Sequence, residues 1–155
     1  MAIEVGSTIP MTAKIGYPGG DHYEVNGESF QQYEVANAEA MFGGTRVVIF
    51  ALPGAFTPVC TTKQFPEFEA KYEELVAAGV DDVYCISVND PYVMGAWETF
   101  VEMADDITET KVKLLSDGNA EITEALGMLV DKSNQGMGKR SWRYAAVVNN
   151  GVVEQ

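Results

Sequence analysis

Residues 47–52, Val47-Val48-Ile49-Phe50-Ala51-Leu52, form an unbroken apolar run, and residues 53–60, Pro-Gly-Ala-Phe-Thr-Pro-Val-Cys, follow it directly. An apolar run of this length predicts a strand that is buried on both faces of a sheet. The Pro-Gly pair at its end predicts a tight turn, and the two prolines of residues 53–58 stiffen that turn. The fold is therefore expected to form around a central strand that leads into a rigid loop.

The segment after this loop predicts a helix that begins at Cys60, with an early kink at Pro66. A thiol at the start of a helix faces main-chain N–H groups without intrahelical partners and the positive end of the helix dipole. Both effects favour the thiolate, so Cys60 is a candidate nucleophile. The alternative is a buried, inert cysteine, which is common among free cysteines. The apolar residues of the predicted helix are Phe65, Phe68, Tyr72, Leu75 and Val76.

Pro53, Thr57 and Cys60 form the pattern P-x-x-x-T-x-x-C, and the eight residues PGAFTPVC resemble the active-site loop of the type II branch of the peroxiredoxin family. The resemblance covers about residues 47–154. It is closest to the peroxiredoxin part of bacterial proteins that fuse this domain to a glutaredoxin, although residues 1–155 contain no glutaredoxin domain. The further segments that carry it are 85–94 with Ala96-Trp97, 114–121 and 138–144.

The resemblance implies a thiol-dependent peroxidase that reduces hydrogen peroxide and alkyl hydroperoxides through a sulfenic acid on Cys60. Thiolate attack on a peroxide needs a low-pKa sulfur, donors that hold both oxygens in line with it, and charge that stabilises the leaving oxyanion. By resemblance, Cys60 is the attacking thiolate, Thr57 contacts the peroxide and Pro53 shields the site from water. No metal, haem, flavin or nicotinamide is implied.

The resemblance also implies that Arg143 stabilises the thiolate and the leaving oxygen, because it stands directly before an aromatic residue and a Val-rich strand. Judged from the residues alone, Arg140 and Arg46 are alternatives for this role, and the other interpretation of these two is ordinary surface charge. The position of Arg143 at the start of a strand would give the guanidinium a rigid base.

Cys85 is the second cysteine of the chain, 25 residues after Cys60. In similar plant type II peroxiredoxins a cysteine at this position is the resolving thiol, which implies a Cys60–Cys85 disulfide. A thiol within an apolar strand is alternatively inert packing, since a disulfide needs Cα atoms within about 7 Å. Resemblance to the glutaredoxin-fused proteins implies instead a one-cysteine route, which we favour, in which glutathione attacks oxidised Cys60 and glutaredoxin removes the adduct. Thioredoxin is the alternative reductant.

Strands and helices alternate from residue 47 onward, which predicts an α/β domain with helices on both faces of a central mixed sheet. The thioredoxin-like fold implied by the resemblance agrees with this pattern. Before the central strand, residues 13–17 predict an edge strand, residues 23–30 a β-hairpin turning at Asn26-Gly27, and residues 37–42 a short helix.

After the Cys60 helix, a second strand is expected at residues 82–88. A helix follows, with Val93, Trp97, Phe100 and Val101 on its buried face. A third strand at 112–116, a helix ending near Gly127, a polar loop at 131–141 and a hairpin closing at Asn149-Asn150-Gly151 complete the expected order.

Length and composition predict a single domain over residues 1–155. The resemblance implies a further C-terminal helix after the last strand, and this sequence stops at Gln155, before such a helix. The net charge of −13 disfavours nucleic acid and anionic lipid as partners. No apolar run approaches a membrane span and no signal peptide is evident, so a cytoplasmic location is expected. Two cysteines and one histidine predict neither a disulfide framework nor a structural zinc site. Type II members that this sequence resembles are commonly monomers or dimers packed near the active-site loop, and we expect a homodimer.

Two other function classes remain open. The first is a thiol–disulfide oxidoreductase of thioredoxin type, but those enzymes use Cys-x-x-Cys, and here Lys63 and Thr57 stand where a second cysteine would be needed. The second is a non-enzymatic redox sensor, in which oxidation of Cys60 switches a partner.

Overall fold

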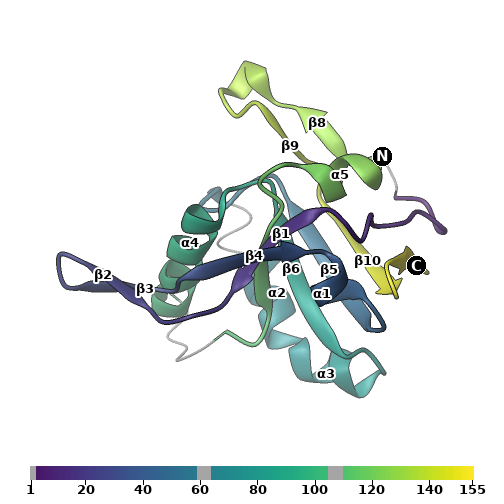
Figure 1. The fold of residues 1–155 in the computed structure, drawn as a ribbon, viewed down its shortest axis with the longest axis horizontal. Helices are drawn as coiled ribbons and strands as arrows, with labels where there is room; N and C mark the ends of the chain where they lie inside the picture. Colours follow the sequence, from purple (N-terminus) through teal and green to yellow (C-terminus); the bar gives the residue numbers. More distant parts are fainter. Residues whose placement is uncertain (1–2, 59–63, 105–109) are drawn as a thin grey trace.

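The computed structural model describes residues 3–58, 64–104 and 110–155. Its centre is a seven-stranded sheet in the order β11-β10-β5-β6-β7-β1-β4 (Figure 1). Strands β5, β6 and β7 are parallel, whereas β10, β11, β1 and β4 are each antiparallel to their neighbours, so the predicted mixed sheet is confirmed. The strands are β1 (Lys14–Pro18), β4 (Tyr33–Asn37), β5 (Arg46–Leu52), β6 (Asp82–Ser87), β7 (Lys113–Ser116), β10 (Tyr144–Asn149) and β11 (Val152–Val153).

Strand β5 is the buried central strand that the apolar run predicts. Every residue from Val47 to Leu52 is buried. Alternate side chains enter two separate apolar clusters: Val47 and Ile49 lie on one face of the sheet, and Phe50 and Leu52 lie on the other. Burial on both faces explains why the sequence shows continuous hydrophobicity here and no polar alternation.

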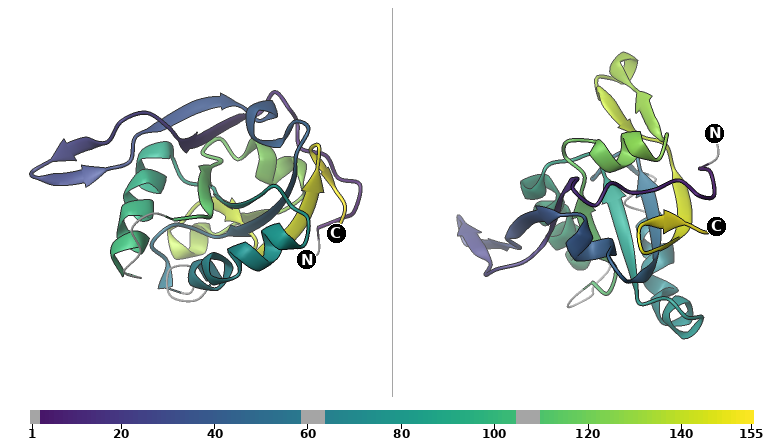
Figure 2. Two further views of the ribbon diagram at one scale, coloured as in Figure 1. Left: turned by 90° about the horizontal axis from the view of Figure 1, so that it is seen from below. Right: turned by 45° about the vertical axis from the view of Figure 1, so that its right-hand side comes forward.

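Helices cover both faces of the sheet, as expected (Figures 1 and 2). Phe42 and Ile122, from the short helices α1 and α5, belong to the cluster on one face. Phe65 of α2 and Trp97 of α4 belong to the cluster on the other, with the half-buried Tyr72 of α3 packed against it. The helices are α1 (Glu39–Phe42), α2 (Phe65–Ala70), α3 (Tyr72–Ala77), α4 (Pro91–Ala104) and α5 (Glu121–Ala125).

The helical segment after the loop is divided into α2 and α3 at Lys71, an interruption that the sequence does not predict. Pro66 lies in the first turn of α2, where its missing N–H removes no helix hydrogen bond. The predicted kink at Pro66 concerns a junction with residues 59–63, which lie outside the described residues.

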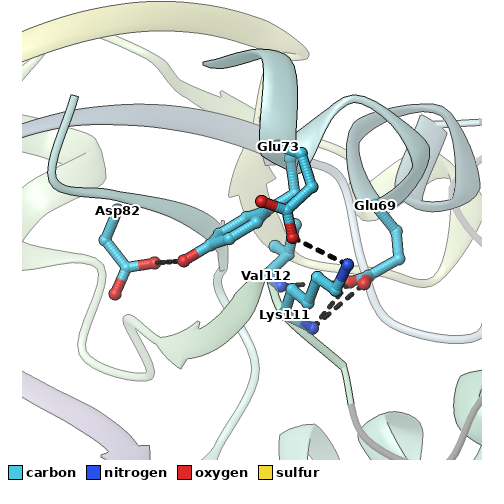
Figure 3. Close-up of polar contacts among 6 residues, drawn as sticks. Glu69, Glu73, Asp82, Lys111 and Val112 are labelled. Carbon is cyan, nitrogen blue, oxygen red and sulfur yellow. Dashed lines mark hydrogen bonds and ion pairs between the residues drawn. The ribbon is translucent and has the colours of Figure 1, made fainter. Parts of the chain in front are cut away.

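The α2–α3 pair is tied to the start of β7 by acidic side chains (Figure 3). The carboxylate of Glu69 accepts hydrogen bonds from the main-chain N–H groups of Lys111 and Val112, all at 3.0 Å. The ammonium of Lys111 forms an ion pair with Glu73 of α3 at 2.9 Å. Both helices therefore contact the same short segment that precedes β7. Glu69 also provides the hydrogen-bond acceptor for the N–H of Val112, which is fully buried.

Two expectations about the strands are wrong. The strand predicted at residues 13–17 does form, as β1, but it is not an edge strand, because the unpredicted β4 pairs with it from Tyr33 to Asn37 and is itself the edge. Strand β4 carries exposed polar residues and little apolar alternation, as is common for edge strands. The sequence pattern is therefore weakest at this strand.

The polar segment 131–141 is a second β-hairpin in place of the expected loop. Strands β8 (Leu129–Asp131) and β9 (Lys139–Ser141) pair antiparallel around a short 3₁₀ turn, η2 (Ser133–Gln135). This hairpin extends away from the body of the molecule (Figure 1), so most of its side chains are exposed and need no apolar alternation.

The two predicted hairpins are confirmed. Strands β2 (Tyr23–Val25) and β3 (Glu28–Phe30) join through Asn26 and Gly27, with φ of 52° and 85°. Strands β10 and β11 join through Asn150 and Gly151, with φ of 49° and 79°. Positive φ at both central residues matches the type of turn that Asn-Gly favours.

Helix α4 begins at Pro91, and the carboxylate of Asp90 caps it by accepting hydrogen bonds from the N–H groups of Tyr92 and Val93, both at 2.9 Å. Its buried face differs in part from the prediction: Trp97 and Val101 are buried, but Phe100 is 40% exposed. Within the described ranges, no helix has both the length and the apolar character to span a membrane.

Candidate active site

The loop after β5 holds two of the predicted site residues, Pro53 and Thr57. Pro53 and Gly54 are buried, whereas Thr57 is half-buried and reaches the surface. Cys60 and its neighbours 59–63 lie outside the described residues. The site is therefore built from the surroundings of the loop.

The hydroxyl of Thr57 donates its proton to the carbonyl oxygen of Gly54 at 2.7 Å. This bond closes the loop on itself and fixes the direction of the hydroxyl. A hydroxyl has one proton and two acceptor lone pairs, so Thr57 Oγ1 keeps only acceptor capacity for a further partner. A molecule bound beside Thr57 would have to donate a proton to it, as the O–H group of a peroxide can.

The turn after β6 supports the loop through Asn89, which sequence reasoning did not place in the site. Asn89 Oδ1 accepts hydrogen bonds from the main-chain N–H of Ala55 at 3.0 Å and from the hydroxyl of Ser87 at 2.5 Å. The hydroxyl of Ser116 donates to the carbonyl oxygen of Asn89 at 2.5 Å. Strands β5, β6 and β7 are parallel neighbours, so their carboxyl ends meet at one edge of the sheet. Because Asn89 lies in the turn after β6, this strand arrangement could have placed it near the loop after β5.

The three candidate arginines occupy different places. Arg46 begins β5 and pairs through Nε with Glu154 at 3.0 Å, so it stands about 20 Å from the loop, a strand length away. Arg140 reaches the loop directly, because its Nη1 donates to the carbonyl oxygen of Pro53 at 3.2 Å. Arg143 precedes β10, whose first residue pairs with Ala51 at the loop end of β5.

The structure thus brings Arg140 and Arg143 to the loop end of the sheet and leaves Arg46 at the other end. The side chain of Arg143 is exposed. Alternation along β10 assigns residue 143 to the same face of the sheet as Ala145 and its partner Phe50, which is the face that α2 covers. The catalytic role of Arg143 stays a prediction.

Cys85 lies in β6, paired with Phe50 of β5, and none of its surface is exposed. It belongs to the apolar cluster that includes Trp97 and Met94. The position agrees with the expected strand setting. Its resolving role stays a prediction, because the other member of the proposed disulfide is outside the described residues.

Two buried ionisable groups lie in the fold beside this edge of the sheet. Burial raises the pKa of the Tyr144 phenol well above its ordinary value, and its hydroxyl has no hydrogen-bond partner among the described residues. Burial also raises the pKa of Asp117, against the opposing effect of hydrogen bonds from Thr123 and Ile122. A phenol of this kind stays protonated at neutral pH, so it is not a candidate base.

Aromatic side chains lie exposed beside the loop. Phe56, at the tip, has a φ of 65° and is 47% exposed. Its ring packs on that of Phe100 in α4, with 5.4 Å between centroids. The exposure of Phe100, which contradicts the predicted helix face, therefore has a local reason: this side chain packs on the loop and not on the sheet.

Comparisons with known proteins give a consistent result. The chain matches the Redoxin family over residues 5–155. It is 50% identical over 131 residues to peroxiredoxin y4vD of Sinorhizobium fredii, covering 84% of this chain and 66% of that protein. It is 44% identical over 115 residues to the hybrid peroxiredoxin hyPrx5 of Haemophilus influenzae, covering 74% of this chain and 45% of that protein.

Among solved structures, the Plasmodium falciparum antioxidant protein, a 1-Cys peroxiredoxin, superposes with a TM-score of 0.80 at 34% identity. The match covers 99% of this chain and 82% of that one, which confirms the predicted thioredoxin-like fold. The chain spans about two thirds of the Sinorhizobium protein and less than half of the Haemophilus protein.

Proposed function

Because this chain belongs to the peroxiredoxins of the Redoxin family, we propose that it is a thiol-dependent peroxidase that reduces hydrogen peroxide and alkyl hydroperoxides. The observation that carries the proposal is the loop after β5, in which the buried Pro53 and the hydrogen-bonded Thr57 stand in the pattern P-x-x-x-T-x-x-C. The orientation of the Thr57 hydroxyl suits a ligand that donates a proton.

In the proposed reaction, the thiolate of Cys60 attacks one oxygen of the peroxide as the O–O bond breaks. The sulfur gives up two electrons and becomes a sulfenic acid, and the other oxygen leaves as water or an alcohol after it gains a proton. Thr57 Oγ1 accepts a hydrogen bond from the peroxide O–H, without proton transfer, and so orients the O–O bond toward the sulfur. The guanidinium of Arg143 stabilises the charge on the thiolate and on the leaving oxygen.

Pro53 has the role of a shield. It is buried directly after β5, and its main-chain nitrogen has no hydrogen that could hold a water molecule beside the thiol. The reaction as proposed needs no metal and no organic cofactor, because the peroxide is the oxidant and a thiol is the reductant. The sulfenic acid must be reduced before a second peroxide reacts.

For this reduction we propose glutathione together with glutaredoxin, with thioredoxin as the alternative. Complete burial of Cys85 supports a one-cysteine route, because a buried strand thiol reaches a sulfenic acid only if the local structure opens. The similar Plasmodium protein is described as a 1-Cys peroxiredoxin, which agrees with this preference. We further propose a homodimer. The exposed Phe56–Phe100 pair supplies an apolar surface beside the loop for such contact.

The test is stopped-flow oxidation of the reduced protein by hydrogen peroxide and by an alkyl hydroperoxide. Wild-type protein should react orders of magnitude faster than a free thiol, and Cys60→Ser should show no fast phase. A wild-type rate equal to that of a free thiol would contradict the proposed peroxidase activity and would favour the hypothesis of a non-enzymatic redox sensor. Steady-state peroxide consumption with glutathione and glutaredoxin, compared with thioredoxin, then identifies the reductant.

A further inference from the structure

The side chain of Arg140 connects the β8–β9 hairpin to the loop after β5. From its place in β9, its Nε donates to the carbonyl oxygen of Met137 at 3.0 Å, within the hairpin. Its Nη1 donates to the carbonyl oxygen of Pro53 at 3.2 Å. One planar guanidinium therefore bonds main-chain oxygens of two segments 84 positions apart in the sequence, Pro53 and Met137.

Gly54 is the residue that allows this approach. A Cβ atom on Gly54 would stand 2.6 Å from Arg140 Nη1, closer than atoms of this kind approach, whereas its distance to Thr57 Cγ2 would be an ordinary 3.5 Å. The guanidinium thus fills the space that a side chain at position 54 would need. The φ of Gly54 lies outside the left-handed region, so backbone conformation does not require glycine here, and a methyl group at position 54 would be accommodated by a shift of the flexible Arg140 side chain away from the turn.

The same turn holds the hydroxyl of Thr57. Arg140 donates a hydrogen bond to the carbonyl oxygen of Pro53. The next carbonyl oxygen, that of Gly54, accepts a hydrogen bond from the hydroxyl of Thr57. Asn89 holds the following N–H, that of Ala55. Each of the three consecutive residues 53–55 therefore has a main-chain group held by a side chain, and Arg140 supplies the hydrogen bond that comes from the β8–β9 hairpin.

We propose that Arg140 is a positioning residue, which holds the Pro53–Gly54 turn so that the hydroxyl of Thr57 is aimed at the bound peroxide. This inference rests on the proposed peroxidase function and adds to it a residue that does not touch the reacting atoms. Two of the five N–H donors of its guanidinium bond main-chain oxygens, and Arg143 is the residue proposed to supply the charge at the peroxide. Displacement of a positioned group by about 1 Å can lower a rate by about 100-fold.

The experiment is a double-mutant cycle on Arg140 and Gly54, read out as the second-order rate constant for peroxide in stopped flow. Arg140→Ala and Gly54→Ala should each lower the rate by about 10- to 100-fold. The double variant should be no slower than the worse single variant, because without the guanidinium the new methyl group has room. Lys139→Ala, an exposed neighbour on β9, is the control and should react at the wild-type rate.

Arg140→Lys separates positioning from charge. A lysine retains the positive charge but cannot donate in two fixed directions, so a positioning role predicts a loss similar to that of Arg140→Ala. A lysine variant that reacts at the wild-type rate would overturn the inference, as would multiplicative losses in the cycle.

A readout that does not depend on peroxide makes the two proposals separable. The pH profile of Cys60 alkylation by iodoacetamide, followed by peptide mass spectrometry, should be displaced in both single variants if the turn moves relative to the thiol. If wild-type protein shows no fast reaction with peroxide, the proposed function fails. In that case Arg140 is still a positioning residue if the pH profile of alkylation shifts in the single variants and the losses of unfolding free energy, measured in urea, are non-additive. An unchanged pH profile, or additive losses, would overturn that role.

Discussion

The side-chain oxygen of Asn89 accepts the main-chain N–H of Ala55 at 3.0 Å, and this bond joins the turn after β6 to the loop after β5. The same oxygen accepts the hydroxyl of the buried Ser87. Asn89→Ala should lower the free energy of unfolding by about 1–3 kcal/mol, because it leaves donors without partners. Asn89→Asp keeps the acceptor oxygen and should lose less.

Urea denaturation of both variants, with Asn119→Ala as an exposed control in a different loop, measures this effect. The peroxide rate of Asn89→Ala should also fall, because the loop that carries Thr57 loses one of its anchors. Equal stability of Asn89→Ala and wild type would show that the bond is not formed in solution.

Arg143→Ala should lower the peroxide rate constant by about 100-fold or more, on the scale expected when one donor to a developing oxyanion is removed. Arg46→Ala is the matched comparison, since it removes the same group from the far end of β5. It breaks a half-exposed pair with Glu154 and should change stability by about 0–1 kcal/mol and the rate not at all. A near-normal rate for Arg143→Ala in stopped flow would transfer the charge role to Arg140.

The parts of the fold that the sequence predicts well are those where one physical signal dominates. Continuous hydrophobicity identifies β5 and β6, and Asn26-Gly27 identifies the first hairpin. The edge strand β4 and the β8–β9 hairpin were missed because their side chains are largely solvated, and solvated strands carry no strict alternation. The interruption between α2 and α3 lies at Lys71, an ordinary helix former, so local propensity gives no signal for it.

The candidate site likewise contains residues that the sequence predicts and residues that only the structure identifies. Pro53 and Thr57 were predictable because they stand in one short motif. The sequence left three arginines open, and only the register of β10 on β5 and the contact to Pro53 separate Arg46 from the other two. Asn89 is an ordinary turn residue in the sequence, and its contact with the loop follows from strand order in space.

Asp117 gives a pH-dependent prediction. Its pKa is raised above the ordinary 3.8 mainly by burial, so in the pH range just above 3.8 the folded protein binds more protons at this residue than the unfolded chain does. Stability contributed by Asp117 is therefore greatest at acid pH and decreases as pH rises through the folded pKa. Asp117→Asn removes this titration and keeps one acceptor oxygen, so it loses only part of the hydrogen bonds that the carboxylate accepts from Thr123 and Ile122.

The difference in unfolding free energy between wild type and Asp117→Asn should accordingly be larger near pH 4 than near pH 7. Urea melts of both proteins across this range measure the difference. A difference that grows toward neutral pH would mean that hydrogen bonding, and not burial, dominates the pKa of Asp117.

Glu69→Ala should destabilise the fold by about 1–3 kcal/mol, because the N–H of the fully buried Val112 loses its acceptor. Glu69→Gln keeps one acceptor oxygen and should lose less. Glu73→Ala is the control on the neighbouring helix: it breaks an ion pair whose side chains are 53% and 72% exposed, which is worth about 0–1 kcal/mol. Denaturant titration that ranked Glu73→Ala as the more damaging change would contradict this assignment.

The last prediction concerns how oxidised Cys60 is reduced. Cys85 has none of its surface exposed and packs in the apolar cluster with Phe50 and Trp97, so a disulfide to it requires local opening of the fold. Cys85→Ala should therefore keep the fast reaction with peroxide and should keep turnover with glutathione and glutaredoxin.

Mass spectrometry after one equivalent of peroxide, without added thiol, tests this directly. The expected product is a protein one oxygen heavier, with the sulfenic acid on Cys60, which glutathione converts to a mixed disulfide. A monomer two hydrogens lighter in wild type, absent in Cys85→Ala, would show that Cys85 resolves Cys60. That result would overturn the one-cysteine route while leaving the peroxidase proposal intact, because the first oxidation is common to both routes.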